Sequence, residues 1–254
     1  MMRLFLLLCT ISSIFGFQSL VSQSMTNIKS FCKHHKIDNS HNEVHSHEVL
    51  FYSKELMKDV SLDQRQKKIV ILGSLFHDIV DRKYVCENRI ETLINELSKV
   101  ESDMSIIART VLYIDNISFS KTVKASSSQL NFTVPEVVPL DKDFKCFDII
   151  RNADLLSSYN LKRAFEYRHA KNPEMSMEDL IQEVQDVYQR RMKKLRSSKI
   201  LTLNYPHCDN LSKHMENLCD KKLKTYQSCS YDKTLSHFEI YPTQRLENIV
   251  EEIK

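Results

Sequence analysis

The chain has 254 residues, of which 42% are hydrophobic, and it carries a formal net charge of +3 and only 2 glycines. This length can bury one sizeable core, whereas two full domains would each be small. The scarcity of glycine disfavours tight hairpins and excludes the glycine-rich loops that cradle nucleotide phosphates, and the small net charge does not indicate a nucleic-acid-binding surface. We therefore expect a single all-α domain.

The first 24 residues have the layout of a targeting segment. A basic residue, Arg3, is followed by an apolar run from Leu4 to Phe17 and then by small and polar residues. This pattern is typical of a presequence for secretion or organelle entry, and the apolar run is short for a membrane-spanning helix. We therefore expect export or organelle entry with no stable membrane span. Translation from Met25 would instead give a cytoplasmic protein.

Two helices are predicted next in the chain. From about Val44, His45 and several apolar residues recur at steps of three and four, which is typical of a helix that faces a core. The following helix is expected to begin after Ser61, a plausible N-cap with Gln64 three positions later, and to continue to about Tyr84. This second helix has the most apolar sequence of the predicted domain.

The rest of the predicted domain, residues 25–226, alternates helices with one long loop. Residues 122–143 contain a serine run and two prolines and show no helical stripe, so they are expected to form a long surface loop. The tail, residues 227–254, lacks strong periodicity and is left unassigned. Further helices are expected at 86–100, 102–121 with a break near Asn116, 144–171 with a bend near Ser157, 176–195 with Ser176 as N-cap, and from about Asp209.

A group of ionisable residues lies within apolar segments, namely His45, His77, Asp78 and Asp154. An ionisable group that faces a core is costly unless it is paired, and coordination of one cation would satisfy all of these residues. Imidazoles with carboxylates suit Mn, Fe, Ni, Co or Zn, and suit Mg less well. Each residue alone is more often structural, so the prediction of a metal site depends on their conjunction.

The first histidine ligand has competitors, because His41 and His47 lie nearby. His45 begins a stripe that continues through Val49 and Tyr52, whereas the corresponding line from His47 passes mainly polar residues. A ligand must face the core-side groove in which the other ligands lie. We therefore predict His45 as the ligand and keep His47 as the alternative.

The order of these motifs resembles the HD-domain metal-dependent phosphohydrolases, helical proteins whose ligands follow the order H, HD, D. The resemblance covers about residues 40–225 and includes HSHEVLFYSKEL, LFHDIVDRKY, IDNISFSK, RNADLLSSYNLKRAFEY and RRMKKLRSSKILTLNYPHCDNLSKHMENL. It implies a single compact HD-domain-like helical bundle that holds a divalent ion. The sequence departs from many relatives at Leu155 and Ser157, where an arginine and an acid are common, which puts the substrate in doubt.

Other site residues follow from position and from this resemblance. Asp81 lies three and four positions beyond Asp78 and His77, so it is expected to share their helix face. We predict that it orients the attacking water or assists proton transfer, with a structural salt bridge as the alternative. Lys83 is a phosphate-contact candidate by resemblance, and Arg163 either reaches the pocket or lies at a surface. The remaining candidates for substrate binding are Lys121, Arg82 and Ser120, whose alternatives are helix-end and loop chemistry.

The resemblance implies hydrolysis of a phosphate ester or anhydride, with Asp78 and the metal at the reaction centre and a metal-activated water as nucleophile. The expected partner is a nucleotide or another small phosphorylated metabolite, and no nucleic acid. The alternatives are a phosphodiesterase that acts on a cyclic or linear nucleotide and a non-catalytic sensor that binds nucleotide or metal. The oligomeric state stays open.

Overall fold

The computed structural model describes residues 2–38, 41–85, 87–126, 129–198, 200–201, 206–227 and 230–239. This part of the chain is mostly helical, as the composition predicts. Its elements are α1 (Met2–His35), α2 (Glu43–Met57), α3 (Gln64–Phe76), α4 (Arg89–Ser98), α5 (Met104–Asn116), α6 (Phe119–Thr122), β1 (Val123–Ser126), β2 (Gln129–Phe132), α7 (Phe144–Ser157), α8 (Leu161–Lys171), α9 (Met177–Val187), a π-helical turn (Tyr188–Met192), α10 (Lys193–Ser197), α11 (Pro206–Thr225) and α12 (Tyr231–Phe238).

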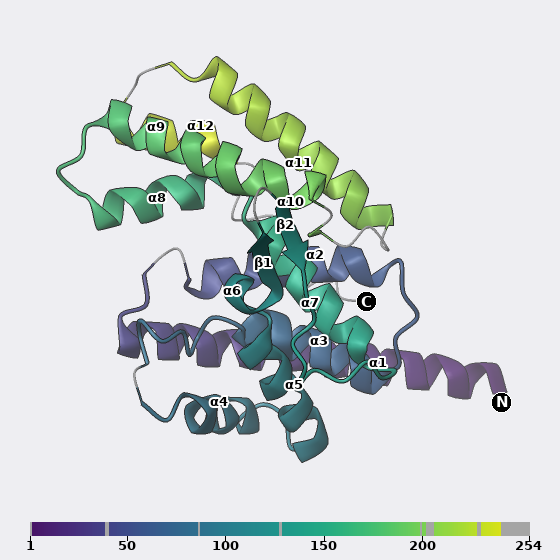
Figure 1. Cartoon of the computed structure of the whole chain (residues 1–254). Coiled ribbons are helices and arrows are strands. Elements are labelled where there is room, and N and C mark those ends of the chain that lie inside the picture. Colours follow the sequence, from purple (N-terminus) through teal and green to yellow (C-terminus); the bar gives the residue numbers. More distant parts are fainter. Residues whose placement is uncertain are drawn as a thin grey trace.

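Three helices form the centre of the molecule. Helix α2 packs against both α3 and α7, and α3 also packs against α7 and α5. In Figure 1, α4 and α5 lie below this centre, α8, α9 and α11 lie above it, and α1 lies behind it at the level of α3. The upper helices are joined to the centre through α11, which packs against α2 and α7. The space between the upper and lower groups is where the candidate site lies.

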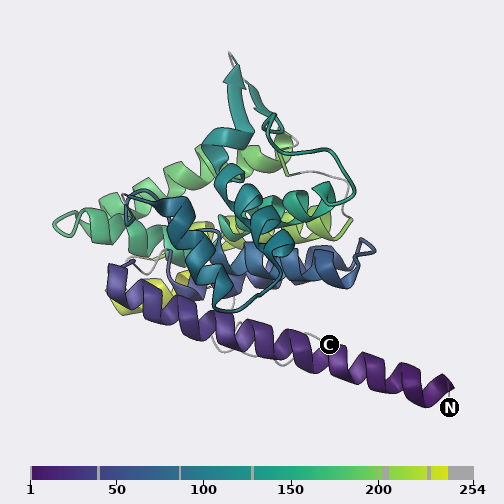
Figure 2. The ribbon, with the colours of Figure 1, turned by 90° about the horizontal axis from the view of Figure 1, so that it is seen from below.

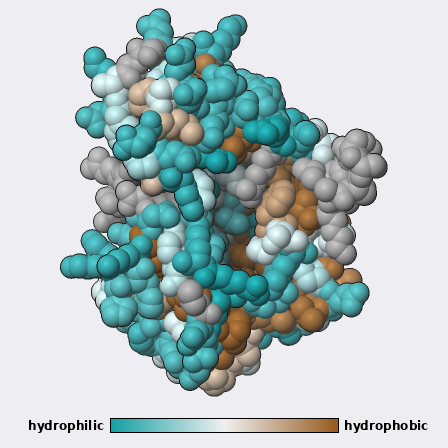
Figure 3. Space-filling view, turned by 60° about the vertical axis from the view of Figure 1, so that its left-hand side comes forward, coloured by the Kyte–Doolittle hydropathy of each residue, from teal (hydrophilic) through white to brown (hydrophobic). Residues whose placement is uncertain are grey.

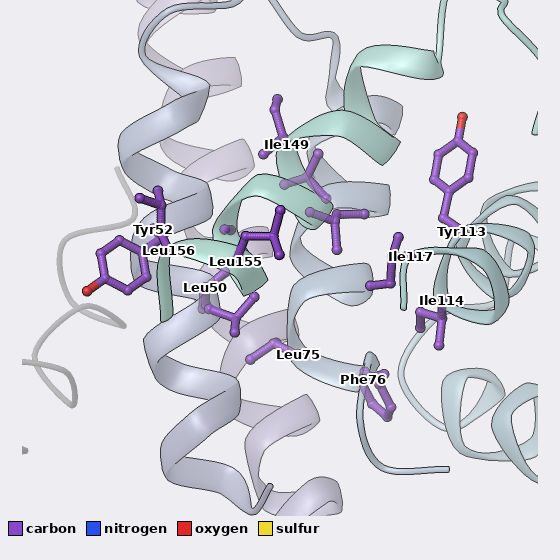
Figure 4. Close-up of a cluster of buried hydrophobic side chains, with 14 of the residues drawn as sticks. Leu50, Tyr52, Leu75, Phe76, Tyr113, Ile114, Ile117, Ile149, Leu155 and Leu156 are labelled. Carbon is purple, nitrogen blue, oxygen red and sulfur yellow. The ribbon is translucent and has the colours of Figure 1, made fainter. Parts of the chain in front are cut away.

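The central part of the core contains apolar side chains from α2, α3, α5 and α7 (Figure 4). Leu50 and Tyr52 of α2 and Leu75 and Phe76 of α3 are each fully buried. A buried leucine or phenylalanine side chain stabilises a fold by about 1.5–3 kcal/mol relative to exposure, so these helices are held together mainly by apolar burial. The predicted stripe of α2 is confirmed, because its apolar members lie in this core.

Close packing fixes α3 relative to its neighbours. A Cβ atom at Gly73 would lie 2.3 Å from Cδ1 of Ile150, so glycine allows α3 to approach α7 closely. The next residue, Ser74, contacts α2. Its single hydroxyl hydrogen is donated to the Val70 carbonyl, so in the 2.7 Å contact between the two hydroxyls Ser53 Oγ is the donor and Ser74 Oγ the acceptor. Both contacts lie within one turn of the end of α3, where the HD pair follows.

The beginning of α3 differs from the expectation. Asp63, and not Ser61, is the N-cap: its carboxylate accepts the backbone N–H of Gln66 at 2.8 Å, and Gln66 Oε1 accepts the backbone N–H of Asp63 at 3.1 Å. This reciprocal pair is a capping box. Ser61 lies upstream of the cap, where its carbonyl accepts a hydrogen bond from Lys145. The N-cap predicted at Ser176 is confirmed.

The cap gives a direct prediction for stability. An Asp63→Ala variant is expected to lower the free energy of unfolding by about 1 kcal/mol, because the first turn of α3 loses its side-chain acceptor. A Ser61→Ala variant is the matched control, and its change is expected to stay within about 0.5 kcal/mol, since that residue contributes only its carbonyl. Urea unfolding monitored by circular dichroism measures both values. A larger effect at Ser61 than at Asp63 would contradict this cap assignment.

The end of α3 also differs from the expectation of a helix that continues to about Tyr84. The helix ends at Phe76, His77 is its C-cap, and residues 77–80 form turns. Ile79 and Val80 are nevertheless buried, so the apolar pattern continues although the backbone has left the helix. His77 and Asp78 therefore lie at a helix end, where adjacent side chains can turn toward one point.

The segment 122–143 is only partly the surface loop that was predicted. It contains the two antiparallel strands β1 and β2, in which Val123 pairs with Phe132. The guanidinium of Arg151 lies 3.9 Å from the centre of the Phe132 ring, which attaches this hairpin to α7. The all-α class is confirmed for the described residues as a whole, and this small two-stranded sheet is an addition that the sequence analysis did not predict.

The two ends of the predicted domain also carry structure. Helix α12 lies within the tail that the sequence left unassigned, and its Phe238 is buried against Phe165 at a ring distance of 6.1 Å. At the other end, α1 passes through the predicted boundary at residue 24, and Phe17, Leu20 and Val21 are buried. Figure 2 shows α1 along one side of the molecule, with its N-terminal end beyond the other helices. Among the described helices, none combines the length and apolar character needed to cross a membrane.

Candidate metal centre

The predicted ligands come together from α2, α7 and the turn that follows α3. Nε2 of His45 on α2 lies 3.0 Å from Nε2 of His77, 3.3 Å from Oδ2 of Asp78 and 3.6 Å from Oδ1 of Asp154. Nε2 of His77 lies 3.6 Å from these same oxygens of Asp78 and Asp154. The ligand atoms of His45, His77 and Asp154 all lie within 4.8 Å of one another, so this group could hold a metal ion.

The orientation of His77 leaves a lone pair for a cation. Its Nδ1 lies 2.8 Å from the carbonyl oxygen of Ser74. Because a carbonyl can only accept, Nδ1 carries the ring hydrogen, and in the neutral ring Nε2 then presents its lone pair to the cluster. Such a backbone partner behind a histidine is the usual support of a metal ligand.

The cluster attracts positive charge. Burial and the charge of Arg163 oppose protonation of His45, but the carboxylates of Asp154, Asp78 and Glu48 outweigh them and raise the pKa of His45 to about 9. Burial likewise opposes ionisation of Asp78, yet the neighbouring His77 and His45 hold its pKa below the usual range. Burial has the same effect on Asp154, and contacts with His45 and His77 again lower its pKa. A proton or a metal ion at the centre would balance the negative charge of these carboxylates.

The spacing of the ligand atoms fits common divalent ions. A tetrahedral or octahedral ion with bonds of about 2.1 Å holds neighbouring ligand atoms about 3.0–3.4 Å apart. The distances around His45 Nε2 run from 3.0 to 3.6 Å, so small adjustments would place the ligand atoms of His45, His77 and Asp154 around one ion. Asp78 is not in this group, although its Oδ2 lies 3.3 Å from His45 Nε2. The mixture of imidazole nitrogen and carboxylate oxygen suits Mn, Fe, Ni, Co or Zn better than Mg.

The cluster lies at the wall of a cavity of about 370 Å³. The side chains of His45 and His77 are only 1% exposed, whereas those of Asp78 and Asp154 are 23% and 30% exposed, so the carboxylates are the accessible members. The cavity is enclosed by α2, the segment after α3, α6 and α7, and by α8, α9 and the π-helical turn above. Figure 3 shows the surface hollowed between the upper and lower helices.

Besides His45, Asp78 and Asp154, two further predicted site residues line this cavity, Asp81 and Lys83. Asp81 Oδ1 accepts the backbone N–H of Lys83 at 3.0 Å, and Lys83 Nζ lies 2.9 Å from Nε2 of His41. The argument that Asp81 shares a helix face with Asp78 is wrong, because α3 ends at Phe76. A turn, and not a helical repeat, brings Asp81 to the cavity.

Three other predicted substrate contacts are not among the residues that line this cavity. Lys121 forms an ion pair with Asp115 at 3.1 Å. Ser120 Oγ lies 3.4 Å from Ser118 Oγ, and Ser118 is the serine that lines the cavity. Arg82 lines a separate cavity beside α4. The reason is local: each of these side chains is directed by a short turn whose geometry the sequence does not specify.

Other cavity residues were missed or left undecided by the sequence analysis. His41 lies 3.8 Å from Asp78 Oδ2, and burial lowers its pKa. Arg163 Nη1 lies 3.2 Å from His45 Nε2, so Arg163 reaches the pocket. Tyr167 and Arg168 lie further along α8. For the residues on α8, the sequence signal that could have placed them was Asn160. Its side chain accepts the Arg163 backbone N–H at 3.0 Å and thereby caps a new helix after the bend.

The choice of His45 as the first histidine ligand stays a prediction, and the geometry is compatible with it. His45 belongs to the group that could hold a metal ion, and His47 does not. The stripe argument succeeded because α2 is regular from Glu43 to Met57, so residues at steps of three and four share one face.

Comparison of the chain with protein-family models, with curated proteins and with solved structures found no significant match. The resemblance to HD-domain phosphohydrolases therefore stays a prediction from the sequence motifs. What the described residues provide is a mainly helical fold with a His/Asp group that could hold a metal ion at the wall of a cavity.

Proposed function

We propose that this chain is a metal-dependent phosphohydrolase with an HD-domain-like fold. The observation that carries the proposal is that three segments far apart in the sequence converge on His45. Its Nε2 lies 3.0 Å from His77 Nε2, 3.3 Å from Asp78 Oδ2 and 3.6 Å from Asp154 Oδ1. The order of these residues matches the H, HD, D order of that family. The open side of the cluster faces a cavity large enough for a small metabolite.

Each residue has a role that its position supports. The four cluster residues would hold a divalent ion, which would supply charge neutralisation at phosphoryl oxygens and acidify a water molecule. Lys83 and Arg163 line the same cavity and would balance the negative charge of the phosphate. Asp81 keeps one carboxylate oxygen beyond its bond to the Lys83 backbone, and this oxygen would accept a proton from the attacking water.

The substrate class that we propose is a nucleotide or another small phosphorylated metabolite. The cavity combines cationic side chains with the aromatic rings of Tyr167 and Phe119, so it offers partners both for a phosphate and for a planar group. Tyr167 has Lys83 Nζ 5.6 Å from its ring centre, which places an aromatic face and an anion partner side by side. This arrangement supports a compact substrate over an extended polyanion.

The test is a product-release assay on the purified chain. Nucleoside mono-, di- and triphosphates and cyclic nucleotides are each incubated with Mn²⁺, Mg²⁺, Co²⁺, Ni²⁺ or Zn²⁺, and the products are separated. We expect release of phosphate or pyrophosphate with at least one ion. An Asp78→Ala variant is expected to lose this activity at least about 100-fold, because it removes an accessible ligand of the ion.

The products also separate the alternatives. A ring-opened or linear monophosphate from a diester would show a phosphodiesterase. Binding of ion and nucleotide with no product across the whole panel would favour a non-catalytic sensor. Equal activity of the wild-type chain and the Asp78→Ala variant would exclude the proposed site.

A further inference from the structure

Arg163 contacts the metal-ligand cluster directly. It lies in the first turn of α8, and its Nη1 is 3.2 Å from Nε2 of His45. Its Nη2 donates to Ser157 Oγ at 3.0 Å, and its Nε lies 3.9 Å from Oε2 of Glu48. Glu48 is in turn held by Asn160 Nδ2, which donates to its Oε1 at 3.1 Å. The base of the guanidinium is therefore anchored, while one end reaches the cluster.

A metal ion and this end of Arg163 compete for the same place. A guanidinium is always charged and has only hydrogen-bond donors, so it has no lone pair with which to coordinate a metal ion. An ion bound to His45 Nε2 would stand next to Nη1, and two cations this close repel one another. Arg163 thus places a positive charge beside the carboxylates of the cluster, and its Nη1 has to leave His45 Nε2 if that nitrogen binds an ion.

The cavity offers Arg163 a second position. The guanidinium is rigid, so a movement of Nη1 away from His45 also shifts Nη2 and Nε. The hydroxyl of Ser157 can rotate to follow Nη2, and the 3.9 Å ion pair with Glu48 does not depend on one exact geometry. The same cavity wall carries Lys83, and guanidinium groups bind phosphate oxygens with two donors at once. An anionic substrate would therefore find Arg163 released and close to the ion.

We propose that Arg163 is an anion-binding residue that exchanges partners: its guanidinium, which lies against His45, moves to the substrate's phosphate when a metal ion binds to the cluster. The inference rests on the metal site of the proposed function. It adds that ion binding and phosphate binding are coupled through one side chain. Arg163 opposes the ion and favours the anion, so its removal changes the two affinities in opposite directions.

The test compares Arg163→Met with the wild-type chain by titration calorimetry. Mn²⁺ is titrated first, and inorganic phosphate is then titrated into the Mn²⁺-saturated protein. We expect Mn²⁺ to bind about tenfold tighter to the variant, because a positive charge beside the ion is removed. We expect phosphate to bind about tenfold more weakly, because a charge-assisted hydrogen bond is lost.

The control is Arg168→Met, which removes the same charge from the same helix and cavity. Arg168 pairs with Glu183 at 3.3 Å and not with the cluster, so its loss is expected to leave the Mn²⁺ affinity close to that of the wild-type chain. A purely structural role for Arg163 would weaken both Mn²⁺ and phosphate binding, and this outcome overturns the inference. So does an Arg163→Met variant whose two affinities are unchanged or match those of Arg168→Met.

The same titrations separate this inference from the proposed function. If Mn²⁺ binds equally to the wild-type chain and to Arg163→Met, the metal site stands and only the exchange of partners fails. If no divalent ion binds to either protein, both the metal site and the exchange fail. Thermal unfolding of each variant without ion verifies that the folded state is retained in every titration.

Discussion

An Asp154→Asn variant is expected to bind Mn²⁺ at least about 100-fold more weakly than the wild-type chain and to lose hydrolytic activity. Asparagine has nearly the shape of aspartate, but it removes the negative charge that attracts a cation to His45 and His77. Changes in groups that merely support a metal ligand already reduce affinity about 10–100-fold, so loss of a ligand is expected to reach at least the upper end of that range. Calorimetry with Mn²⁺ and the product-release assay measure the two effects.

Helix α2 provides a matched pair of controls for this prediction. His45 and His47 lie two positions apart, but only His45 belongs to the cluster. His45→Ala is expected to lose the ion as Asp154→Asn does, whereas His47→Ala is expected to bind Mn²⁺ with wild-type affinity. Loss of binding at His47 with retention at His45 would reverse the ligand assignment. Wild-type affinity in His45→Ala and Asp154→Asn alike would remove the metal centre altogether.

The cluster could be predicted because its members lie on regular elements. His45 and Asp154 each occupy a helix whose apolar stripe specifies which side faces the core, and both helices pack against α3. Periodicity gives the direction of a side chain, but it gives no distance between helices. That distance depends on contacts such as Gly73 with Ile150, which belong to the packed structure.

Residues beyond the ends of helices were predicted less well. The sequence indicates a helix through Asp81 because Ile79 and Val80 are buried in turns and continue the apolar pattern. No glycine or proline marks the end of α3 at Phe76. The hairpin was missed for another reason. β1 and β2 are each four residues long, which is too short for an alternating pattern to be recognised beside a serine run.

Arg163 shows a further limit of prediction from sequence. Its place in the cavity depends on the reversal of the chain between α7 and α8, where Ser157 ends one helix and Asn160 caps the next. A continuous or slightly bent helix, as expected, would carry Arg163 away along its axis. The cap turns the chain back, and Arg163 then contacts both Ser157 and His45.

The second large effect concerns the N-terminal helix. Deletion of residues 2–24 is expected to remove most of the stability of the fold, because Phe17, Leu20 and Val21 are buried in the core. Burial of each such side chain contributes about 1.5–3 kcal/mol, so their joint loss is about 5–9 kcal/mol. Domains are typically stable by about 5–15 kcal/mol, and the shortened chain is therefore expected to be marginal or unfolded. Urea unfolding of the full chain and the deletion measures the difference.

A shorter deletion, of residues 2–15, is the matched control. The N-terminal end of α1 extends beyond the other helices in Figure 2, so the midpoint of unfolding is expected to change much less. Downstream contacts also remain in this variant, such as the hydrogen bond from Asn27 Nδ2 to the Glu96 carbonyl at 3.1 Å, which ties α1 to α4. Equal losses in the two deletions would contradict the role assigned to residues 17–24.

This comparison also bears on the proposed export of the protein. We propose that the apolar start of the chain directs it to the secretory pathway or an organelle, but a cut after residue 24 would divide α1 within its buried part. If the 2–24 deletion unfolds and the 2–15 deletion does not, any processing site compatible with the fold lies before Phe17. If the 2–24 deletion unfolds at the same urea concentration as the full chain, the buried segment is not needed for stability, and a boundary at residue 24 is compatible with the fold. N-terminal sequencing of the natural protein then decides which boundary is used.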